Sequence, residues 1–446
     1  MIPWPAATLV AYCTLASAAV APDAPPGDDL PRRATMGVAI ALADRTKPAD
    51  PRRNPVVVVK AMDGGAGAAA GVRAGDVVEA LDGEPIGTPE ALVAAVRRHR
   101  GGDVVQLDLR RAGAPLRLAV ALRPRPYETS PSGEVLYRSV TVRGARRRVI
   151  VTRPRGDGRH PAVLVIGGLG CYSLDHADRS GGYGRVIAAL TERGFATMRV
   201  EKPGQGDSEG PDCHDPAATP QLEADGYLAG LRALKSYAFV DGAKVFVFAH
   251  SLGPIIGSLA LTEEPVRGVV AVETVGRSWF EYDLERVRLQ AALRGTAYDE
   301  VDRIVREYEA CSHRFFVEKQ APEVLRRTPA CAAVLDPLAS VPATYMQQVA
   351  DINLPRQWRR IDAPVLVVHG TASPVTTASE GRYLAEVINS FHPGRARYVE
   401  VPGMGHDLAR YASPREYLQR REGAPPPFHE GLLDVVGGWL DEQLRG

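Results

Sequence analysis

The chain has 446 residues, of which 45% are hydrophobic and 24% are charged, as is typical of a globular protein with two or three domains. Its 54 basic and 53 acidic side chains nearly cancel, which leaves a net charge of +1. This balance excludes a general electrostatic attraction to nucleic acid or to anionic membranes.

The first 33 residues are predicted to be a signal-like leader and a linker. Residues 6–21 are apolar and end in small side chains that offer A-x-A-type cleavage sites, and a polar, Pro-rich stretch follows at 22–33. This pattern is typical of a secretory signal, although no Lys or Arg precedes the apolar run. We therefore expect an exported protein, periplasmic or secreted, with no integral membrane segment once the leader is removed.

Residues 34–125 form the first predicted domain, in which short Val-rich runs are separated by turns. The sequence AAAGVRAGDVV at residues 68–78, followed by LDGEPI at 81–86, resembles that of a PDZ domain of the bacterial periplasmic-protease kind. The resemblance implies a small β-rich domain that binds peptide C-termini by strand addition. The matching carboxylate-binding loop would contain Gly37, Val38 and Ala39. The alternative is a domain that only packs on the rest of the chain and binds no peptide.

Residues 126–133 are a polar, Pro-containing linker, and the pattern changes after it. From residue 134 to 446, apolar strand-like runs alternate with helical segments, which predicts an α/β domain with a parallel sheet covered by helices on both faces. The interval at about 278–360 breaks the rhythm and is interpreted as a helical cap inserted between two strands. The basic run at 146–148 is interpreted as a solvated surface segment.

Residues 244–253, with the sequence KVFVFAHSLG, predict a strand that turns sharply into a helix. Ala249 and Gly253 lie two positions before and after Ser251, where only small residues fit. The arrangement resembles the nucleophile elbow of the α/β-hydrolase superfamily, with Ala249 in place of the usual first glycine. The resemblance covers residues 134–446 and implies a serine hydrolase of the esterase or peptidase-like type, with Ser251 as nucleophile.

The same resemblance assigns the remaining groups that act on the acyl bond. The general base would be a histidine after the last strand, and His406 occupies that place. The oxyanion would be held by the backbone N–H of Leu252 and by a second N–H from the Gly-rich stretch at 167–171, where Leu169 is the first choice and Gly168 the next. A turn at 201–210 is similar to a structural G-x-G-x-S turn of the family.

The acid of the expected triad departs from the family's usual pattern. The usual aspartate position after the seventh strand is occupied by Ser373, whose neutral hydroxyl cannot balance an imidazolium. Some relatives place the acid after the sixth strand, and here Glu273 follows the strand-like run 268–272. We therefore expect Glu273 to orient His406; the alternative is that Glu273 pairs with an arginine of the cap, such as Arg277, and that the triad is incomplete. Two further acids are weaker candidates: Glu380 and Asp362.

Four cysteines remain if Cys13 is removed with the leader. We expect the disulfides Cys171–Cys213 and Cys311–Cys331, because each would join loops of one subdomain in an oxidising compartment. The alternative is four free thiols in a cytosolic enzyme. No His/Cys cluster has metal-ligand spacing, so we expect neither a metal nor an organic cofactor.

The function implied is hydrolysis of an ester or other acyl bond through an acyl-Ser251 intermediate. The expected partners are a small-molecule ester or peptide substrate and a peptide C-terminus at the PDZ domain, without nucleic acid. Two alternatives stay open. One is a peptidase that acts on short peptides, and the other is a catalytically weak peptide-binding scaffold, because Ser373 replaces the usual aspartate.

Overall fold

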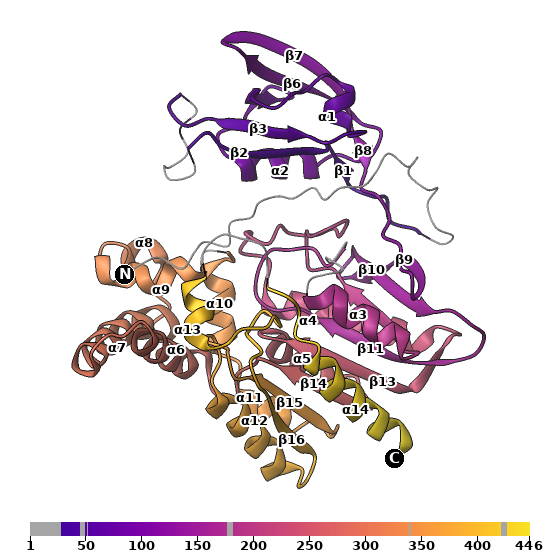
Figure 1. Cartoon of the computed structure of the whole chain (residues 1–446), viewed down its shortest axis with the longest axis vertical. Coiled ribbons are helices and arrows are strands. Elements are labelled where there is room, and N and C mark those ends of the chain that lie inside the picture. The colour runs from indigo at the N-terminus through magenta and orange to yellow at the C-terminus, as the bar shows by residue number, and fades with distance from the viewer. Residues whose placement is uncertain (1–27, 45–49, 51, 176–181, 339, 421–425) are drawn as a thin grey trace. The chain divides into compact units, whose positions relative to one another are not determined.

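The computed structural model describes residues 28–44, 50, 52–175, 182–338, 340–420 and 426–446. These residues form two compact units that divide between Tyr127 and Glu128 (Figure 1). The predicted cleavage sites of the leader lie outside the described residues. Within the part that the structure describes, no helix is both long and apolar enough to cross a membrane.

The first unit is built mainly from antiparallel strands. Its larger sheet has the order β2-β3-β4-β6-β7, with β5 paired to β4, and a small ladder joins β1 to β8. The strands are β1 (Ala34–Thr35), β2 (Val38–Leu42), β3 (Val56–Ala61), β4 (Val77–Leu81), β5 (Glu84–Pro85), β6 (Val104–Arg111), β7 (Ala114–Ala121) and β8 (Arg123–Pro124). In β6, buried Val105, Leu107 and Leu109 alternate with more exposed residues, so one face of the sheet supplies the core.

Two helices complete this unit, α1 (Ala66–Ala69) and α2 (Pro89–Arg97). Helix α2 starts as its sequence predicts, because the Thr88 side chain accepts a hydrogen bond from the N–H of Ala91 and Pro89 occupies the first turn. Leu92, on the buried side of α2, packs into the same core as β6.

The second unit contains an eight-stranded sheet with the order β16-β15-β14-β13-β11-β12-β10-β9. Its strands are β9 (Gly133–Val142), β10 (Ala145–Pro154), β11 (His160–Ile166), β12 (Ala196–Val200), β13 (Val240–His250), β14 (Gly268–Val272), β15 (Val365–Gly370) and β16 (Ala396–Val401). The strands from β11 to β16 are parallel, whereas β9 and β10 are antiparallel to their neighbours. Arg143 and Gly144, both with positive φ, close the tight hairpin that makes this end antiparallel.

Helices cover both faces of this sheet (Figure 1). One face packs on α3 (Gly182–Glu192) and α14 (Gly431–Arg445) through residues such as Leu190 and Leu432. The other face packs on α4 (Pro220–Ser236), α5 (Gly253–Leu261), α11 (Leu354–Trp358) and α12 (Ala378–Phe391). A short α13 (Pro414–Gln419) follows β16. The predicted α/β class is therefore confirmed, with a mixed rather than wholly parallel sheet.

The chain between β14 and β15 forms the helical insertion. It contains α6 (Trp279–Leu293), α7 (Tyr298–Ser312), η1 (His313–Val317), α8 (Pro322–Leu325), η2 (Pro329–Cys331), α9 (Ala332–Leu335), η3 (Asp336–Leu338) and α10 (Ala343–Ala350), and it ends with α11. The insertion begins sharply, because Ser278 and Glu281 form a capping box at the start of α6. We refer to α6–α11 as the cap.

Candidate active site

Ser251 lies at the sharp turn between β13 and α5. Its φ of 57° is in the left-handed region, which a non-glycine residue adopts only at some cost in energy. The N–H of Ser251 donates to the carbonyl of Val272, which fixes the turn to the end of the neighbouring strand. A Cβ on Gly253 would lie 2.9 Å from the carbonyl oxygens of Ile166 and Gly167, so this position requires glycine. The sequence therefore forms the predicted elbow.

His406 follows β16 and reaches the Ser251 side chain. Its Nε2 atom lies 3.0 Å from Ser251 Oγ, and its Nδ1 atom lies 3.2 Å from Glu273 Oε2. Because a carboxylate only accepts hydrogen bonds, Nδ1 carries the proton and Nε2 is free to accept the serine proton. This tautomer is the one that a general base needs.

Glu273 is fully buried directly after β14, with a φ of 52°. Its Oε1 accepts the N–H of Gly370, and its Oε2 accepts the hydroxyl of Thr376 at 2.6 Å. Nδ1 of His369 lies 3.2 Å from Oε1. Although burial alone raises the pKa of Glu273, the hydrogen bonds from His369 and His406 outweigh it and hold this pKa well below its ordinary value. Glu273 is therefore ionised at neutral pH.

The alternative partners of Glu273 and His406 lie elsewhere. Arg277 forms its ion pair with Glu380, whose Oε2 also accepts the N–H of Gly276 at 2.9 Å, so the predicted alternative pairing of Glu273 with Arg277 is wrong. Asp362 lies near His392 and Arg395.

Ser373 is linked to Glu273 through one residue, Thr376. Its buried Oγ accepts the N–H of Thr376 at 3.3 Å, and Thr376 in turn donates to Glu273. The serine at the usual aspartate position thus supports the loop that holds the carboxylate.

Two of the three expected oxyanion donors are Leu252, which directly follows Ser251, and Leu169, which follows the Gly168 that approaches the Ser251 side chain. Leu252 is the N-cap of α5, and Leu169 belongs to the loop that follows β11, which we call the glycine loop (residues 167–175). Within the described residues, neither N–H has a hydrogen-bond partner in the protein.

Gly168 does not fit the role of oxyanion donor. Its N–H donates to the hydroxyl of Tyr183 at 3.0 Å, so this amide is already occupied. The glycine serves a steric purpose instead, because a Cβ here would lie 2.9 Å from the Cβ of Ser251 and 3.3 Å from its Oγ. The expectation for Gly168 is therefore corrected, and Leu169 remains the candidate from this loop.

A chain of buried hydrogen bonds through Tyr183 and His250, which the sequence analysis did not include, joins the glycine loop to the backbone of His406. The Nε2 of His250 lies 2.8 Å from the carbonyl oxygen of His406, so Nε2 donates and Nδ1 accepts from Tyr183 at 2.7 Å. Burial and the neighbouring His406 lower the pKa of His250 to about 3, so its ring is neutral. The adjacency of His250 to Ser251 was the only sequence signal.

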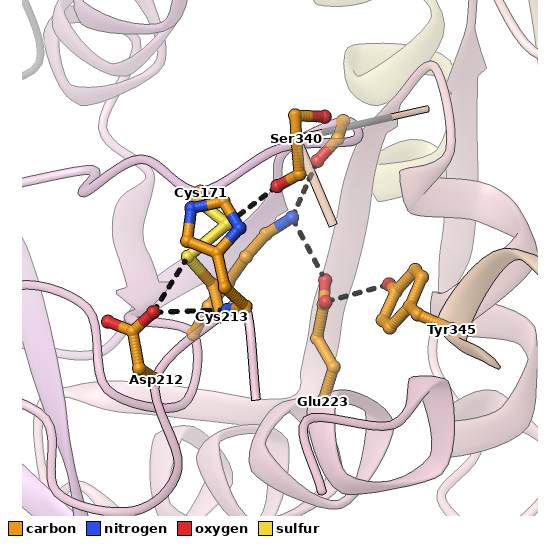
Figure 2. The surroundings of a disulfide bond; sticks show 9 residues. Cys171, Asp212, Cys213, Glu223, Ser340 and Tyr345 are labelled. Atoms are coloured by element: carbon orange, nitrogen blue, oxygen red, sulfur yellow. Dashed lines mark hydrogen bonds and ion pairs between the residues drawn. A yellow bond between two sulfur atoms is a disulfide. The ribbon is translucent and has the colours of Figure 1, made fainter. Parts of the chain in front are cut away.

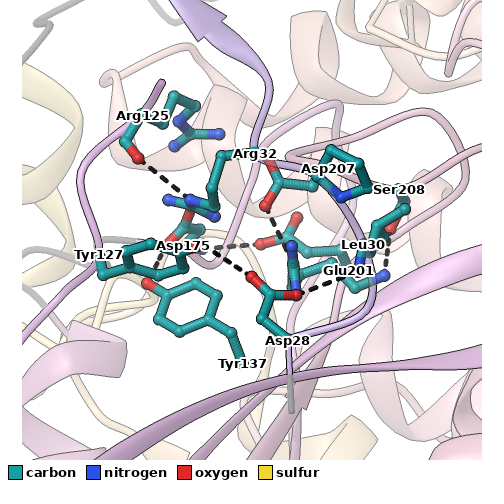
Figure 3. A network of polar contacts seen from close by, with 12 residues as sticks. Asp28, Leu30, Arg32, Arg125, Tyr127, Tyr137, Asp175, Glu201, Asp207 and Ser208 are labelled. Atoms are coloured by element: carbon teal, nitrogen blue, oxygen red, sulfur yellow. Dashed lines mark hydrogen bonds and ion pairs between the residues drawn. The ribbon is translucent and has the colours of Figure 1, made fainter. Parts of the chain in front are cut away.

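The far end of the glycine loop is anchored by buried carboxylates. The N–H of Asp175 donates to Glu201 Oε1 at 2.7 Å, and the hydroxyl of Tyr137 donates to Asp175 at 2.7 Å (Figure 3).

In the adjoining turn at 201–210, Asp207 forms a fully buried ion pair with Arg148. The prediction that the run at 146–148 is solvated is therefore wrong for Arg147 and Arg148, which β10 buries inside the sheet, whereas the Arg146 side chain is 36% exposed.

Both expected cysteine pairs are bonded, with Cα–Cα distances of 5.6 Å for Cys171–Cys213 and 5.2 Å for Cys311–Cys331. The first joins the glycine loop to the segment after β12 (Figure 2), and the second lies in the cap. His214 lies near the first disulfide, but sulfurs bonded to each other are not thiolate ligands for a metal.

The residues expected to bind a peptide carboxylate lie together in the first unit. Val38 and Ala39 begin β2, which is an edge strand of its sheet, and Gly37 precedes them with a φ of 70°. The N–H of Gly37 donates to the hydroxyl of Thr35 at 3.3 Å. An edge strand has one row of backbone groups open to an added strand.

Comparison with protein families identifies both units. A model described as the alpha/beta hydrolase family matches residues 163–420, and a PDZ domain model matches residues 34–122. No curated protein matches the sequence significantly.

The solved structures to which this chain is similar include several esterases. An esterase from Pyrococcus furiosus is 14% identical, with a TM-score of 0.44, and the match covers 72% of this chain and 96% of that one. Est1E from Butyrivibrio proteoclasticus is 16% identical, with a TM-score of 0.43, over 71% of this chain and 100% of its own. Acetyl xylan esterase 1 from a Thermoanaerobacterium species is 18% identical, with a TM-score of 0.41, over 71% and 85%.

Proposed function

Because this chain belongs to the alpha/beta hydrolase family and carries an N-terminal PDZ domain, we propose that it is a serine hydrolase that cleaves ester bonds. The observation that carries the proposal is the pair of contacts that links Ser251 Oγ to His406 at 3.0 Å and His406 to Glu273 at 3.2 Å. A serine hydroxyl needs such a base to become a nucleophile, and the base needs a charge that stabilises its protonated form.

In the proposed reaction, Ser251 Oγ attacks the acyl carbon while His406 Nε2 takes the serine proton. The carbonyl oxygen becomes an oxyanion that accepts hydrogen bonds from the N–H groups of Leu252 and Leu169. The imidazolium of His406, stabilised by ionised Glu273, then protonates the leaving alcohol. Water then gives a proton to His406 and attacks the acyl-Ser251 ester; the bond from the acyl carbon to Ser251 Oγ breaks, the acid leaves, and His406 returns the proton to Oγ. These steps use only side chains and backbone amides, so the proposal includes no metal or organic cofactor.

Peptide hydrolysis is the second candidate function, because the same triad attacks amides. The observation that favours it is the edge strand β2, which begins with Val38 and Ala39 directly after Gly37 and where a peptide C-terminus would add as a further strand. A PDZ domain that captures peptides would raise the concentration of peptide substrate around the hydrolase domain.

We also propose that the protein is exported to the periplasm or the medium. Two disulfides fit an oxidising compartment. The leader predicted from residues 1–33 would direct the chain there.

A fluorophosphonate probe tests the proposal directly, because it bonds covalently to an activated serine. We expect the wild-type protein to be labelled and the Ser251→Ala protein, with an unchanged melting temperature, to stay unlabelled. A folded wild-type protein that takes no label would favour the peptide-binding scaffold instead.

Substrate choice is tested by parallel assays on p-nitrophenyl esters of graded acyl length and on aminoacyl anilides. We expect kcat/KM to be higher for the esters, with a maximum at one acyl length that reports the size of the acyl pocket. Faster cleavage of the anilides would establish the peptidase instead.

A further inference from the structure

The carbonyl oxygen of the peptide bond between Gly168 and Leu169 accepts two hydrogen bonds. The carbonyl oxygen of Gly168 accepts the ammonium of Lys202 at 2.7 Å and the hydroxyl of Tyr172 at 3.2 Å. The N–H on the other side of this bond is that of Leu169, the proposed oxyanion donor. In a trans peptide the C=O and N–H point in opposite directions. Whatever fixes the carbonyl therefore also fixes the direction in which the Leu169 N–H points.

Lys202 is itself held in a buried position. Its ammonium lies 3.3 Å from Glu223 Oε1 and over the ring of Tyr172, with side-chain exposures of 9% for Lys202 and 6% for Glu223. Glu223 also accepts the hydroxyl of Tyr227 at 2.7 Å. It accepts as well the hydroxyl of Tyr345, from the cap helix α10, at 2.8 Å, a contact that Figure 2 shows. The cationic end of Lys202 is thus directed at the Gly168 carbonyl rather than at solvent.

A buried ion pair of this kind contributes little net stability, because removing both charges from water costs about as much as their attraction returns. The pair therefore needs another explanation, and its location supplies one. The ammonium forms a charge-assisted hydrogen bond, which is shorter and stronger than a neutral one. Such a bond draws electron density toward the carbonyl oxygen and makes the N–H of the same peptide a better donor.

We propose that Lys202 is a positioning residue of the oxyanion hole, which orients and polarises the Gly168–Leu169 peptide so that the Leu169 N–H stabilises the oxyanion. This inference rests on the proposed serine hydrolase function. The disulfide Cys171–Cys213 supports it, because the same loop is tied a second time, three residues beyond Gly168, to the segment that follows Lys202. Glu223 and Tyr345 hold the ammonium in place and connect it to the cap.

The test compares Lys202→Met with the wild-type protein, using p-nitrophenyl acetate as substrate. Methionine keeps the length of the side chain and removes the charge and the hydrogen bond. Removing a direct oxyanion donor typically lowers kcat by about 100- to 1,000-fold. For a residue that acts through the donor we expect a loss of about 10- to 100-fold in kcat, with KM changed less than about threefold.

Lys235→Met is the matched control. Lys235 also forms an ion pair, with Glu264 at 2.7 Å, and lies in the same helix α4 as Glu223, but it is remote from the glycine loop in its contacts. We expect this variant to lose some thermal stability and to keep the wild-type kcat.

A second measurement separates an oxyanion effect from a general loss of structure. A boronic acid forms a tetrahedral anionic adduct on the serine, so its Ki reports the oxyanion hole directly. We expect the Ki to rise in Lys202→Met by the same factor by which kcat/KM falls, and to stay unchanged in Lys235→Met. Equal kcat values or equal Ki values in the two variants would overturn the inference.

If Lys202→Met fails to fold, as judged by its melting curve, Tyr172→Phe provides the decision. This variant removes the second donor to the Gly168 carbonyl, together with the longer contact of 3.4 Å to the Tyr183 hydroxyl. We expect a loss of about fivefold in kcat, as for one neutral hydrogen bond. An unchanged kcat in Tyr172→Phe would then overturn the inference. A wild-type protein with no esterase activity and no fluorophosphonate label would instead overturn the proposed function, and this inference with it.

Discussion

The Nδ1 atom of His406 lies 3.2 Å from a carboxylate oxygen of Glu273, a residue that follows β14 rather than β15. The two strands are adjacent and parallel, with Val272 opposite Val368, so their carboxyl ends meet at one place. Thr376, from the loop after β15, donates its hydroxyl to Glu273 and its N–H to Ser373. The usual aspartate position is therefore joined to Glu273 through a single residue.

Replacing Glu273 by Gln tests this acid. The amide keeps the size of the side chain but removes the charge that stabilises the imidazolium of His406, so we expect kcat for p-nitrophenyl acetate to fall by about 1,000- to 10,000-fold. Glu380→Gln is the control, because Glu380 is equally buried and pairs with Arg277 instead. A Glu273→Gln enzyme with nearly wild-type kcat would show that the acid lies elsewhere.

Returning an aspartate to position 373 is the companion experiment. In the Glu273→Gln protein, Ser373→Asp places a carboxylate that is separated from position 273 only by Thr376, and we expect kcat to rise at least about tenfold above that of Glu273→Gln. In the wild-type protein the same change places two carboxylates together, and we expect a lower melting temperature because like charges repel. If Ser373→Asp changes neither kcat in the Glu273→Gln protein nor the melting temperature of the wild-type protein, carboxylates at positions 273 and 373 do not occupy the same place.

Gly168→Ala tests the steric role of the glycine loop. The new Cβ would lie 2.9 Å from the Cβ of Ser251, and displacing the nucleophile should lower kcat by about 10- to 100-fold. Gly226→Ala is the control, since its Cβ would meet only Val200 at 3.8 Å inside α4. We expect that change to raise the free energy of unfolding by up to about 1 kcal/mol. Equal activities of the two variants would refute the steric role.

The buried His250 predicts a loss of stability in acid. Its folded-state pKa of about 3 lies below the ordinary histidine value of about 6.5, so between these values only the unfolded chain takes up the proton. The free energy of unfolding should therefore fall as pH falls below about 6.5, with a share of about 2 kcal/mol from His250 between pH 7 and pH 5.

Urea denaturation of the wild-type and His250→Gln proteins at pH 7, 6 and 5 measures this share. The variant loses hydrogen bonds to Tyr183 and His406 at every pH, so we expect it to be less stable at pH 7 but to change less with pH. Parallel pH dependences of the two proteins would mean that His250 does not titrate on unfolding.

The two disulfides should differ in their effects on catalysis. They join residues 42 and 20 positions apart, and removing either should cost about 3–4 kcal/mol of stability by the loop-entropy estimate. Only Cys171–Cys213 ties down the glycine loop. We therefore expect the Cys171→Ser/Cys213→Ser protein to lose kcat at a temperature where it remains folded, whereas Cys311→Ser/Cys331→Ser keeps it. Equal kcat values in the two double variants would show that both disulfides contribute to stability only.

Much of the site could be predicted from sequence because its signals are local. The strand, turn and helix around Ser251 lie within a few consecutive residues. His406 lies in the turn after β16, which is where the family resemblance expects the general base. The capping of α2 by Thr88 is equally local. Two interpretations failed because they depended on distant partners: the amide of Gly168 is occupied by Tyr183, and Arg148 is buried against Asp207.

The sequence by itself thus determined the α/β fold class through its hydrophobic periodicity, and its resemblance to the α/β-hydrolase superfamily pointed to the elbow at Ser251 and to His406. Only the tertiary structure decided that Glu273 contacts His406 and that Lys202 holds the Gly168 carbonyl. Both contacts join segments whose proximity is set by the order of strands in the sheet. That order arises from burial of both sheet faces over the whole domain, and no local pattern encodes it.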